Sequence, residues 1–497
     1  MSNSNSTSSK LMTNWRWWMC LLLFIATTVN YMDRQVLSLT WKDFIAPEFH
    51  WTDSDYGTIT ALFSIIYAIC MLFAGKFIDW MGTKKGYLWA IGVWSAGACI
   101  HAACGWATMH IEGFESIHAM TAVEVGSGAA LAIASTSVYL FIAARAILAL
   151  GEAGNFPAAI KVTAEYFPKK DRAFATSLFN AGASVGALVA PATIPLLAQY
   201  FKDLGIGGGW EMAFIIIGAL GFIWMGFFVF MYDRPENSKF VNEAELAYIH
   251  QDDEVETATV KEETAAKSEE KQIPFWKCFT YRQTWSFIVG KFFTDGVWWF
   301  YLFWAPAYFS DQYGYSSSSG MGIALIFTLY AIVTVLSIFG GYLPKLFVEK
   351  KGMNPYNGRM LAMLLFAFLP LPALFAQGLG VHSVWWPCII IGLAGAGHQA
   401  WSANLFSTIG DMFPKSAIAT ITGIGGMAGG IGSFLINKGA GALFTYSEGM
   451  GSAFQFLGFE GKQAGYMIIF CICAVAYVLA WSIMKALVPK HKPVVVD

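Results

Sequence analysis

Long apolar runs separated by short polar segments constrain this chain more than any other feature of its sequence. A helix needs about 20 mostly apolar residues to cross the hydrocarbon core of a membrane. The chain of 497 residues is 56% hydrophobic and 13% charged, whereas a soluble domain is about 25% charged. We therefore predict an all-α polytopic membrane protein with twelve transmembrane helices in two six-helix bundles. The predicted helices span residues 15–40, 56–80, 86–107, 136–165, 173–199, 211–232, 284–310, 319–343, 359–377, 383–410, 418–437 and 465–486.

A polar and mostly acidic segment divides the twelve predicted helices into two sets of six. Its composition is typical of a linker that is partly helical and partly disordered. We expect one six-helix bundle at residues 1–232, a cytoplasmic loop at 233–283 and a second six-helix bundle at 284–497. Two other segments, 108–135 and 438–464, are longer than ordinary turns between membrane helices, and the sequence assigns them no role.

Lysine and arginine residues are distributed unequally between the two sets of loops. With both termini placed inside, the inner segments hold 23 of the 31 basic residues, and the outer segments hold only Lys42, Lys202, Lys438 and Lys462. Loops rich in Lys and Arg stay in the cytoplasm. We therefore expect an integral, multi-pass protein of the plasma (inner) membrane with both termini cytoplasmic.

The two halves of the chain resemble each other where the fourth and tenth predicted helices end. The triplet Phe-Pro-Lys occurs at residues 167–169 and again at 413–415, an offset of 246 residues. The same offset pairs Glu165 with Asp411, Gly186 with Gly432, and Glu152 with His398. Six helices, a loop and six more helices are typical of a parallel repeat, whose halves are related by an axis along the membrane normal.

Four ionisable residues fall within the predicted helices of the first half. Asp33 and Arg34 lie in the first helix, and Arg145 and Glu152 lie two turns apart on one face of the fourth. Charged groups inside a membrane are costly, so they face a partner or a water-filled cavity. Protonation of an acid neutralises it and frees an arginine for an anion, which is a physical basis for proton coupling. The alternative is a structural ion pair that locks the bundle.

The second half offers aromatic rings, neutral polar groups and one charged pair. Lys291 and Asp295 are one turn apart on the seventh predicted helix and can form an ion pair. The candidate binding residues of this half are Trp298, Tyr301, His398, Gln399, Trp401, Ser402 and Asn404, and Tyr67 and Asn180 are candidates in the first half. Aromatic faces beside hydrogen-bonding groups suit a sugar ring. The alternatives are an aromatic belt at the membrane interface and hydrogen bonds within the core.

The loop after the second predicted helix contains "GKFIDWMGTKKG", which begins at Gly75. This stretch resembles the signature of the major facilitator superfamily, Gly-x-x-x-Asp-x-x-Gly-x-basic-basic, with Asp79, Gly82, Lys84 and Lys85 in its positions. The basic residue that usually follows the aspartate is a tryptophan here. The resemblance implies the major facilitator fold, in which the motif is a cytoplasmic latch between helices that takes part in gating. The alternative is an ordinary charged loop.

Four further stretches resemble the anion:cation symporter branch of this superfamily: "NYMDRQ", "RAILALGEAGNFPA", "TDGVWWFYLFW" and "HQAWSANLF". Within the branch the chain looks most like bacterial hexuronate transporters, and other members carry galactonate, sialic acid or phosphate. The resemblance implies proton-coupled uptake of a sugar acid by alternating access, with Arg34 binding the substrate carboxylate. It implies a part in proton coupling for Asp33 and Glu152, with Arg145 beside them. A glutamine that galactonate carriers use is replaced by a small residue here, Ala183, which favours a hexuronate.

The sequence gives little support to other functions or partners. The eight cysteines show neither metal-binding spacing nor a disulfide framework, and we expect no cofactor, no bound metal and no catalytic residue. We expect a monomer that binds a small anionic sugar acid and a proton within the lipid bilayer, and that binds no nucleic acid. The competing interpretation is a symporter for another organic anion, such as galactonate, sialic acid or an aromatic acid. A membrane-embedded enzyme would need a nucleophile and a base, for which His398 and Glu152 are the nearest candidates.

Overall fold

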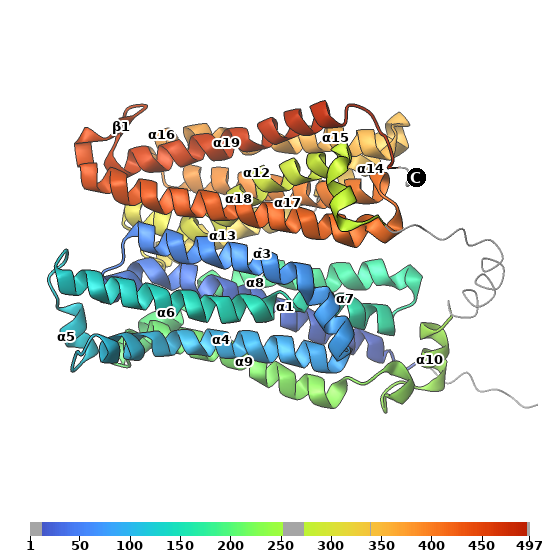
Figure 1. Cartoon of the computed structure of the whole chain (residues 1–497), viewed down its shortest axis with the longest axis horizontal. Helices are drawn as coiled ribbons and strands as arrows, with labels where there is room; N and C mark the ends of the chain where they lie inside the picture. Colours follow the sequence, from blue (N-terminus) through green and yellow to red (C-terminus); the bar gives the residue numbers. More distant parts are fainter. Residues whose placement is uncertain (1–11, 252–272, 338, 495–497) are drawn as a thin grey trace, which may run out of the picture.

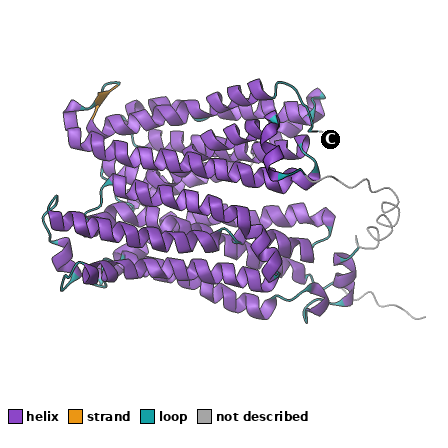
Figure 2. Ribbon diagram, viewed as in Figure 1, coloured by secondary structure: helices purple, strands orange, loops and turns teal. Residues whose placement is uncertain are grey.

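The computed structural model describes residues 12–251, 273–337 and 339–494. Most of these residues belong to helices that run side by side along one long axis (Figure 1), and the described strands form one short hairpin (Figure 2). The long helical segments are α1 (Trp15–Thr40), α3 (Asp53–Met81), α4 (Thr83–Ile111), α6 (Gly128–Glu152), α7 (Asn155–Tyr166), α8 (Lys169–Asp203), α9 (Trp210–Met231), α12 (Arg282–Tyr313), α13 (Gly320–Ser337), α14 (Phe339–Lys351), α15 (Pro355–Ala367), α17 (Trp385–Met412), α18 (Lys415–Met450) and α19 (Gly461–Leu487). The short elements are η1 (Trp41–Ile45), α2 (Ala46–Phe49), α5 (Ile117–Thr121), η2 (Pro235–Asn237), α10 (Glu243–Ile249), η3 (Phe275–Thr280), η4 (Leu371–Phe375), α16 (Ala376–Gly380), η5 (Gly451–Ala453), β1 (Gln455–Phe456) and β2 (Phe459–Glu460).

The prediction of twelve membrane helices is confirmed. The fourth predicted helix is divided into α6 and α7, and the ninth into α15, η4 and α16. The eighth corresponds to α13 and α14, on either side of residue 338, which lies outside the described residues. Within the described residues, eight helical segments are long and apolar enough to cross a membrane. The other four, α1, α12, α17 and α18, are of similar length but carry charged, polar or glycine-rich stretches. Three of these four helices carry candidate binding or coupling residues.

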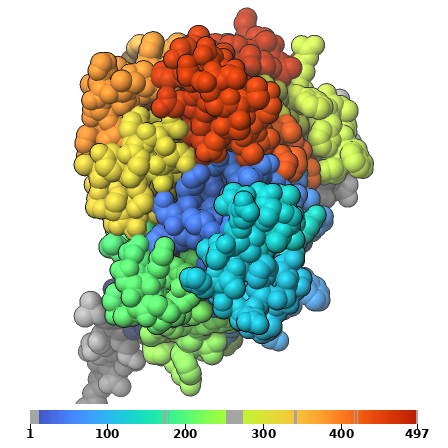
Figure 3. All heavy atoms as spheres, turned by 90° about the vertical axis from the view of Figure 1, so that its left-hand side faces the viewer, coloured from blue at the N-terminus to red at the C-terminus, as the bar shows by residue number. Residues whose placement is uncertain are grey.

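The two halves of the chain lie on opposite sides of the bundle, with α1 to α9 on one side and α12 to α19 on the other (Figure 1). The short helix α5 and the hairpin lie at one end, which we call the insert end. The start of α1, α10 and the described C-terminus lie at the opposite end, which we call the terminal end. Figure 3 looks onto the insert end, where helices of both halves meet.

The fourth membrane helix breaks next to a buried acid. α6 ends at Glu152, and α7 begins at Asn155. Pro157 explains the break, because its ring would clash with the carbonyl of Ala153 in a continuous helix and it has no N–H to donate. Close packing fixes the position of the break, since a Cβ at Gly151 would lie 2.3 Å from a backbone nitrogen of α4. The break therefore holds Glu152 at a defined depth beside α4.

The two halves of the internal repeat also pack their helices in the same way. In the first half α8 lies on α1, and a Cβ at Gly186 would be only 2.5 Å from the carbonyl oxygen of Thr28. In the second half α18 lies on α12, and a Cβ at Gly432 would be 2.0 Å from the carbonyl oxygen of Phe292. Gly186 and Gly432 are the two residues that the offset of 246 pairs. Each half thus uses an equivalent glycine to bring two helix backbones together.

Much of each long insert is helix. α4 continues to Ile111 and α6 already begins at Gly128, so α5 and short turns fill most of the segment 108–135. In the second half α18 continues to Met450, and the antiparallel pair of β1 and β2 occupies the rest of 438–464 with short turns. Hydropathy marks only the apolar part of a helix, which is why the sequence places these ends in connections.

The described part of the central loop is attached to the first half. Arg16 Nη1 lies 3.1 Å from Glu245 Oε1 on α10, and the ring of Trp15 stacks on that of Phe240 at 4.2 Å. Helix α10 agrees with the expectation of a partly helical linker. The rest of that expectation concerns residues 252–272, which lie outside the described residues.

Candidate functional site

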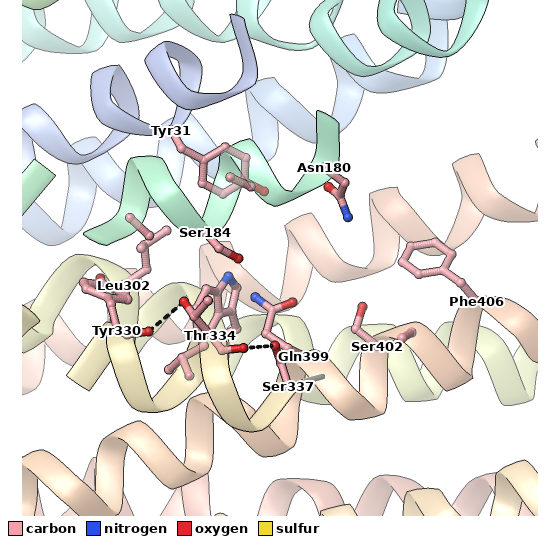
Figure 4. Close-up of a pocket in the computed structure, with 15 residues that line it drawn as sticks. Tyr31, Asn180, Ser184, Leu302, Tyr330, Thr334, Ser337, Gln399, Ser402 and Phe406 are labelled. Carbon is pink, nitrogen blue, oxygen red and sulfur yellow. Dashed lines mark hydrogen bonds between the residues drawn. The ribbon is translucent and has the colours of Figure 1, made fainter. Parts of the chain in front are cut away.

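A cavity of about 450 Å³ lies between the two halves. It is nearer the terminal end, because Asn180 is close to the start of α8 and Ser402 is close to the end of α17. In Figure 4, Tyr31 and Asn180 of the first half face Gln399 and Ser402 of the second. The lining residues are Tyr31, Asn180, Ala183, Ser184, Ala187, Trp298, Leu302, Tyr330, Val333, Thr334, Ser337, Gln399, Ser402, Ala403 and Phe406.

The wall of the cavity combines aromatic rings with uncharged hydrogen-bonding groups, and no lining residue carries a charge. Four of the residues that the sequence singled out lie on it: Asn180, Trp298, Gln399 and Ser402. Hydroxyl and amide groups can bind a polyhydroxylated molecule, while the rings pack against its carbon skeleton. The charge of an ionised ligand has to be met by groups behind the wall.

Arg34 and Glu152 form a buried ion pair next to Tyr31, a residue of the wall. Glu152 Oε2 accepts hydrogen bonds from Arg34 Nε at 3.0 Å and from Nη2 at 2.8 Å. The guanidinium carbon lies 5.2, 4.7 and 5.3 Å from the ring centres of Tyr31, Tyr67 and Trp299. Tyr31 also lines the cavity, whereas Arg34 is not among the lining residues.

The other two ionisable residues of the first half lie next to this pair. Arg145 Nη2 donates a hydrogen bond of 3.4 Å to the carbonyl of Arg34, and its guanidinium lies 5.1 Å from the ring centre of Phe63. Asp33 is 1% exposed, and neither of its carboxyl oxygens has a hydrogen-bond partner among the described residues. Glu152 therefore pairs with Arg34, although the spacing on α6 places it on the same face as Arg145.

Helix α17 presents two different faces. Gln399, Ser402 and Phe406 line the cavity, whereas His398 and Trp401 point away from it into the second half. An α-helix turns by about 100° per residue, so neighbouring positions face different sides. The sequence prediction treated residues 398–404 as one lining and could not separate the two faces.

His398 lies directly behind the wall. Its ring stacks on Trp298 with centres 5.4 Å apart and planes at 2°, and its Nδ1 lies 2.8 Å from the hydroxyl of Tyr477. His398 thus fixes the orientation of Trp298, which lines the cavity, but does not line the cavity itself.

Four other candidates lie off the wall, and one of them is Tyr67, whose ring contacts Arg34. Tyr301 and Trp401 are buried in the core, where Trp401 packs edge-on against Tyr477. Asn404 donates to the carbonyl of Ala400 at 2.8 Å and faces a separate pocket between α14, α15 and α17.

Polar lining residues on α13 were not found from the sequence. Tyr330, Thr334 and Ser337 recur at intervals of four and three residues within an apolar run, which places them on one face of a helix. That spacing is the signal that could have found them. Ser184 carries a similar signal, since it follows Asn180 by four residues.

The signature loop forms ion pairs at the terminal end. Asp79 Oδ1 lies 2.7 Å from Lys161 Nζ of α7, and Lys84 Nζ lies 2.8 Å from Asp233 Oδ1 beyond α9. Gly82 has a φ of 78° between α3 and α4, a conformation that favours glycine. Lys85 is exposed, and a Cβ at Gly75 would meet no atom within 4 Å. The loop therefore ties together helices of the first half.

A network of four charged residues joins the two halves at the insert end. Lys42 Nζ lies 3.4 Å from Asp53 and 2.8 Å from Asp311, and Lys462 Nζ lies 2.6 Å from Asp53 and 2.7 Å from Asp311. Burial disfavours the charge of Lys42, but Asp311 and Asp53 together raise its pKa above the ordinary value. The sequence analysis identified Lys42 and Lys462 only as basic residues of outer segments and did not single out Asp53 or Asp311, because the contacts link positions far apart in the chain.

The two ends of the bundle differ in how the halves are connected. Besides the four charges, Asp43 accepts hydrogen bonds of 2.7 Å from the Ser310 hydroxyl and from the Ser317 backbone N–H at the insert end. At the terminal end, no ion pair found between described residues joins the two halves. Four of them lie within the first half and the central loop, and two lie within the second half. The structure is therefore closed at the insert end, with its cavity displaced toward the terminal end.

Comparison with known proteins gives consistent results. A family model described as Major Facilitator Superfamily matches residues 23–436. The chain is 28% identical over 429 residues to the hexuronate transporter of Escherichia coli (strain K12), covering 86% of this chain and 87% of the relative. It is 27% identical over 359 residues to the galacturonate transporter of Dickeya chrysanthemi, covering 71% and 88%. It is 23% identical over 461 residues to a probable galactarate/D-glucarate transporter of Escherichia coli (strain K12), covering 92% and 94%.

Solved structures show the same fold. A bacterial homolog of the human lysosomal transporter Spinster, in an inward-facing and occupied conformation, aligns with a TM-score of 0.65 at 18% identity, covering 95% of this chain and 97% of the other. A D-xylose-proton symporter aligns with a TM-score of 0.62 at 16% identity, covering 96% and 98%. At these identities the likeness concerns the fold alone.

Labelling of single cysteines tests the position of the cavity. We expect Ser402→Cys, on the wall, to react with a water-soluble methanethiosulfonate reagent much faster than Ala400→Cys, which is buried two residues earlier on the same helix. The measurement is the labelling rate in purified protein, after subtraction of the rate for the native cysteines. Equal rates at the two positions would contradict the described cavity.

Proposed function

The chain belongs to the Major Facilitator Superfamily, and we propose that it takes up a sugar acid, specifically a hexuronate, by proton-coupled alternating access. Membership makes it an integral, multi-pass membrane transporter and not an enzyme. The names of the hexuronate and galacturonate transporters to which it is similar support the substrate class. The wall of aromatic rings, hydroxyls and amides supports a polyhydroxylated substrate.

The terminal end faces the cytoplasm in this proposal, and the protein lies in the plasma (inner) membrane. The excess of Lys and Arg in the segments of the terminal end supports this orientation. The described structure then represents the inward-facing state, with the insert end closed toward the outside. The cavity is enclosed by helices of a single chain, which supports a monomer as the transporting unit.

The ion pair of Arg34 with Glu152 is the observation that carries the proposal. A guanidinium can hold a carboxylate through two parallel hydrogen bonds, and in the described state Nε and Nη2 of Arg34 both donate to one oxygen of Glu152, Oε2. A proton on Glu152 removes its charge and leaves Arg34 free for the carboxylate of the substrate. This contact requires a rearrangement at the wall next to Tyr31, because Arg34 is not among the residues that line the cavity.

Asp33 and Arg145 complete the coupling group. The two acids and two arginines of this group are formally neutral together, and neither carboxyl oxygen of the buried Asp33 has a hydrogen-bond partner within the part of the chain that the structure describes. Burying an unpaired charge costs several kcal/mol, about 3–5 when one partner of a buried pair is removed. Asp33 is therefore the second proton acceptor of the group, and Arg145 keeps a positive charge next to it when Arg34 engages the substrate.

Alternating access requires the two halves to separate at the insert end. We assign the moving units to residues 1–232 and 284–497, connected by the loop at 233–283. The charges of Lys42, Asp53, Asp311 and Lys462 would hold the inward-facing state closed and separate in the outward-facing state. The loop with Asp79 and Lys84 stabilises the first half at the terminal end and serves as its latch.

A carrier for another organic anion is the second candidate. Galactonate, sialic acid and aromatic acids also present one carboxylate to an arginine. Ala183 lines the cavity, at the position where galactonate carriers are expected to have a glutamine. Its small side chain leaves room for a sugar ring and supports a hexuronate over galactonate.

Uptake by purified protein in lipid vesicles tests the function. We expect glucuronate or galacturonate to accumulate inside when the internal side is alkaline, and not when a sodium gradient replaces the pH gradient. The measurement covers a panel of sugar acids, including galactonate and sialic acid. Accumulation of none of the acids, or conversion of the substrate to another compound, would refute the proposal.

Substitution of Glu152 tests the coupling. Glu152→Gln imitates the protonated acid, so Arg34 should bind substrate while the proton no longer controls binding. We expect exchange of labelled for unlabelled substrate to persist and pH-driven accumulation to be lost. Glu165→Gln is a control outside the coupling group, because Glu165 hydrogen-bonds Thr83 and Tyr232 near the terminal end. Retained pH-driven accumulation in Glu152→Gln would move the coupling role to another residue.

A further inference from the structure

A second buried ion pair lies in the other half and has no part in the mechanism above. Lys291 Nζ is 2.6 Å from Asp295 Oδ2, and the two side chains are 7% and 13% exposed. Both residues lie on α12, one turn apart. A buried ion pair adds little to stability compared with apolar packing of the same volume. Ionisable residues within membrane helices therefore indicate a functional role.

The Lys291–Asp295 pair is placed like the Arg34–Glu152 pair. Lys291 Nζ lies 4.5 Å from the ring centre of Phe406, and Phe406 lines the cavity. Each cation thus lies against an aromatic ring of a residue that lines the cavity, Tyr31 in the first half and Phe406 in the second. Each cation is also neutralised by one carboxylate.

Helix α18 is shaped around the acid of this pair. A Cβ at Gly429 would lie 2.2 Å from Asp295 Oδ2, so a larger residue there would displace the carboxylate. The titratable groups that face the pair from neighbouring helices are His398 on α17 and Tyr477 on α19. His398 is hydrogen-bonded to Tyr477, and the Tyr477 hydroxyl donates to the Thr294 carbonyl at 3.2 Å.

We propose that Lys291 is a second anion-binding residue, which binds the distal acidic group of a six-carbon diacid after Asp295 has accepted a proton. This inference rests on the proposed function of the same cavity. The proton adds to the Asp295 carboxylate from cavity water, the ion pair is lost, and the Lys291 ammonium keeps its charge. When Glu152 and Asp295 are both protonated, Arg34 and Lys291 carry unpaired positive charges beside the uncharged wall. One of these cations belongs to each half of the protein.

Charge balance distinguishes two classes of substrate. A monoacid neutralises Arg34 alone and leaves Lys291 paired with Asp295. A diacid neutralises both cations and connects the two halves through its two ends. The protein should therefore carry an aldarate as well as the corresponding hexuronate, and Lys291 should set the preference between them.

Uptake of galacturonate and galactarate in vesicles tests the inference, because the two acids differ in a second carboxylate at the opposite end of the carbon chain. We expect wild-type protein to accumulate both. In Lys291→Gln we expect the ratio of galactarate to galacturonate uptake to fall about tenfold, since a charge-assisted hydrogen bond contributes at least that factor. Lys291→Arg keeps the charge and should keep most of the ratio. The control is Lys345→Gln, an exposed lysine of the same half that also pairs with an acid four residues away, and it should leave the ratio unchanged.

Three results would overturn the inference. If wild-type protein accumulates galacturonate and not galactarate, the proposed function stands and the inferred transport of a diacid is wrong. If Lys291→Gln lowers the uptake of galacturonate and galactarate equally, so that their ratio is unchanged, the Lys291–Asp295 pair has a structural role only. Wild-type protein that accumulates neither acid overturns the inference, and it contradicts the proposed function as well if glucuronate does not accumulate either. Galacturonate uptake in each variant also reports that the protein is folded.

Discussion

The ion pair between Arg34 and Glu152 is the contact on which the rest of the first half depends. A guanidinium buried among membrane helices needs a negative partner, and Glu152, the last residue of α6, supplies it. The break before Pro157 and the absence of a side chain at Gly151 together fix the acid beside α4. On the opposite side, α8 approaches α1 through Gly186 and brings the cavity wall close to the pair.

In both halves a buried cation lies against an aromatic residue of an uncharged cavity wall. Arg34 contacts Tyr31 and Lys291 contacts Phe406, and no lining residue carries a charge. An uncharged wall lets the empty carrier change conformation without moving a net charge through the membrane. In the proposed cycle, protons and an anionic substrate enter together, and the cations exchange one negative partner for another. The insert-end charges, Lys42 and Lys462 with their aspartates, would hold the state in which this exchange faces the cytoplasm.

Local properties of the sequence predict the helices and part of the cavity wall. Apolar length predicts all twelve membrane helices, and a fixed offset predicts the repeat that Gly186 and Gly432 show in packing. Contacts between distant residues cannot be read from local spacing. Arg34 and Glu152 are 118 residues apart, and spacing on α6 pointed to Arg145 instead. The separation of His398 from Gln399 depends on the rotation of α17, which an apolar pattern on all sides of a helix does not determine.

Proton uptake on substrate binding tests the central claim most directly. Titration calorimetry in two buffers of different ionisation enthalpy counts the protons that the purified protein takes up when hexuronate binds. If the substrate carboxylate replaces Glu152 on Arg34, binding takes up a proton, so affinity should rise as the pH falls. The account predicts about one proton per bound hexuronate in the wild type and a smaller number in Glu152→Gln. Binding without proton uptake, with affinity independent of pH, would contradict it.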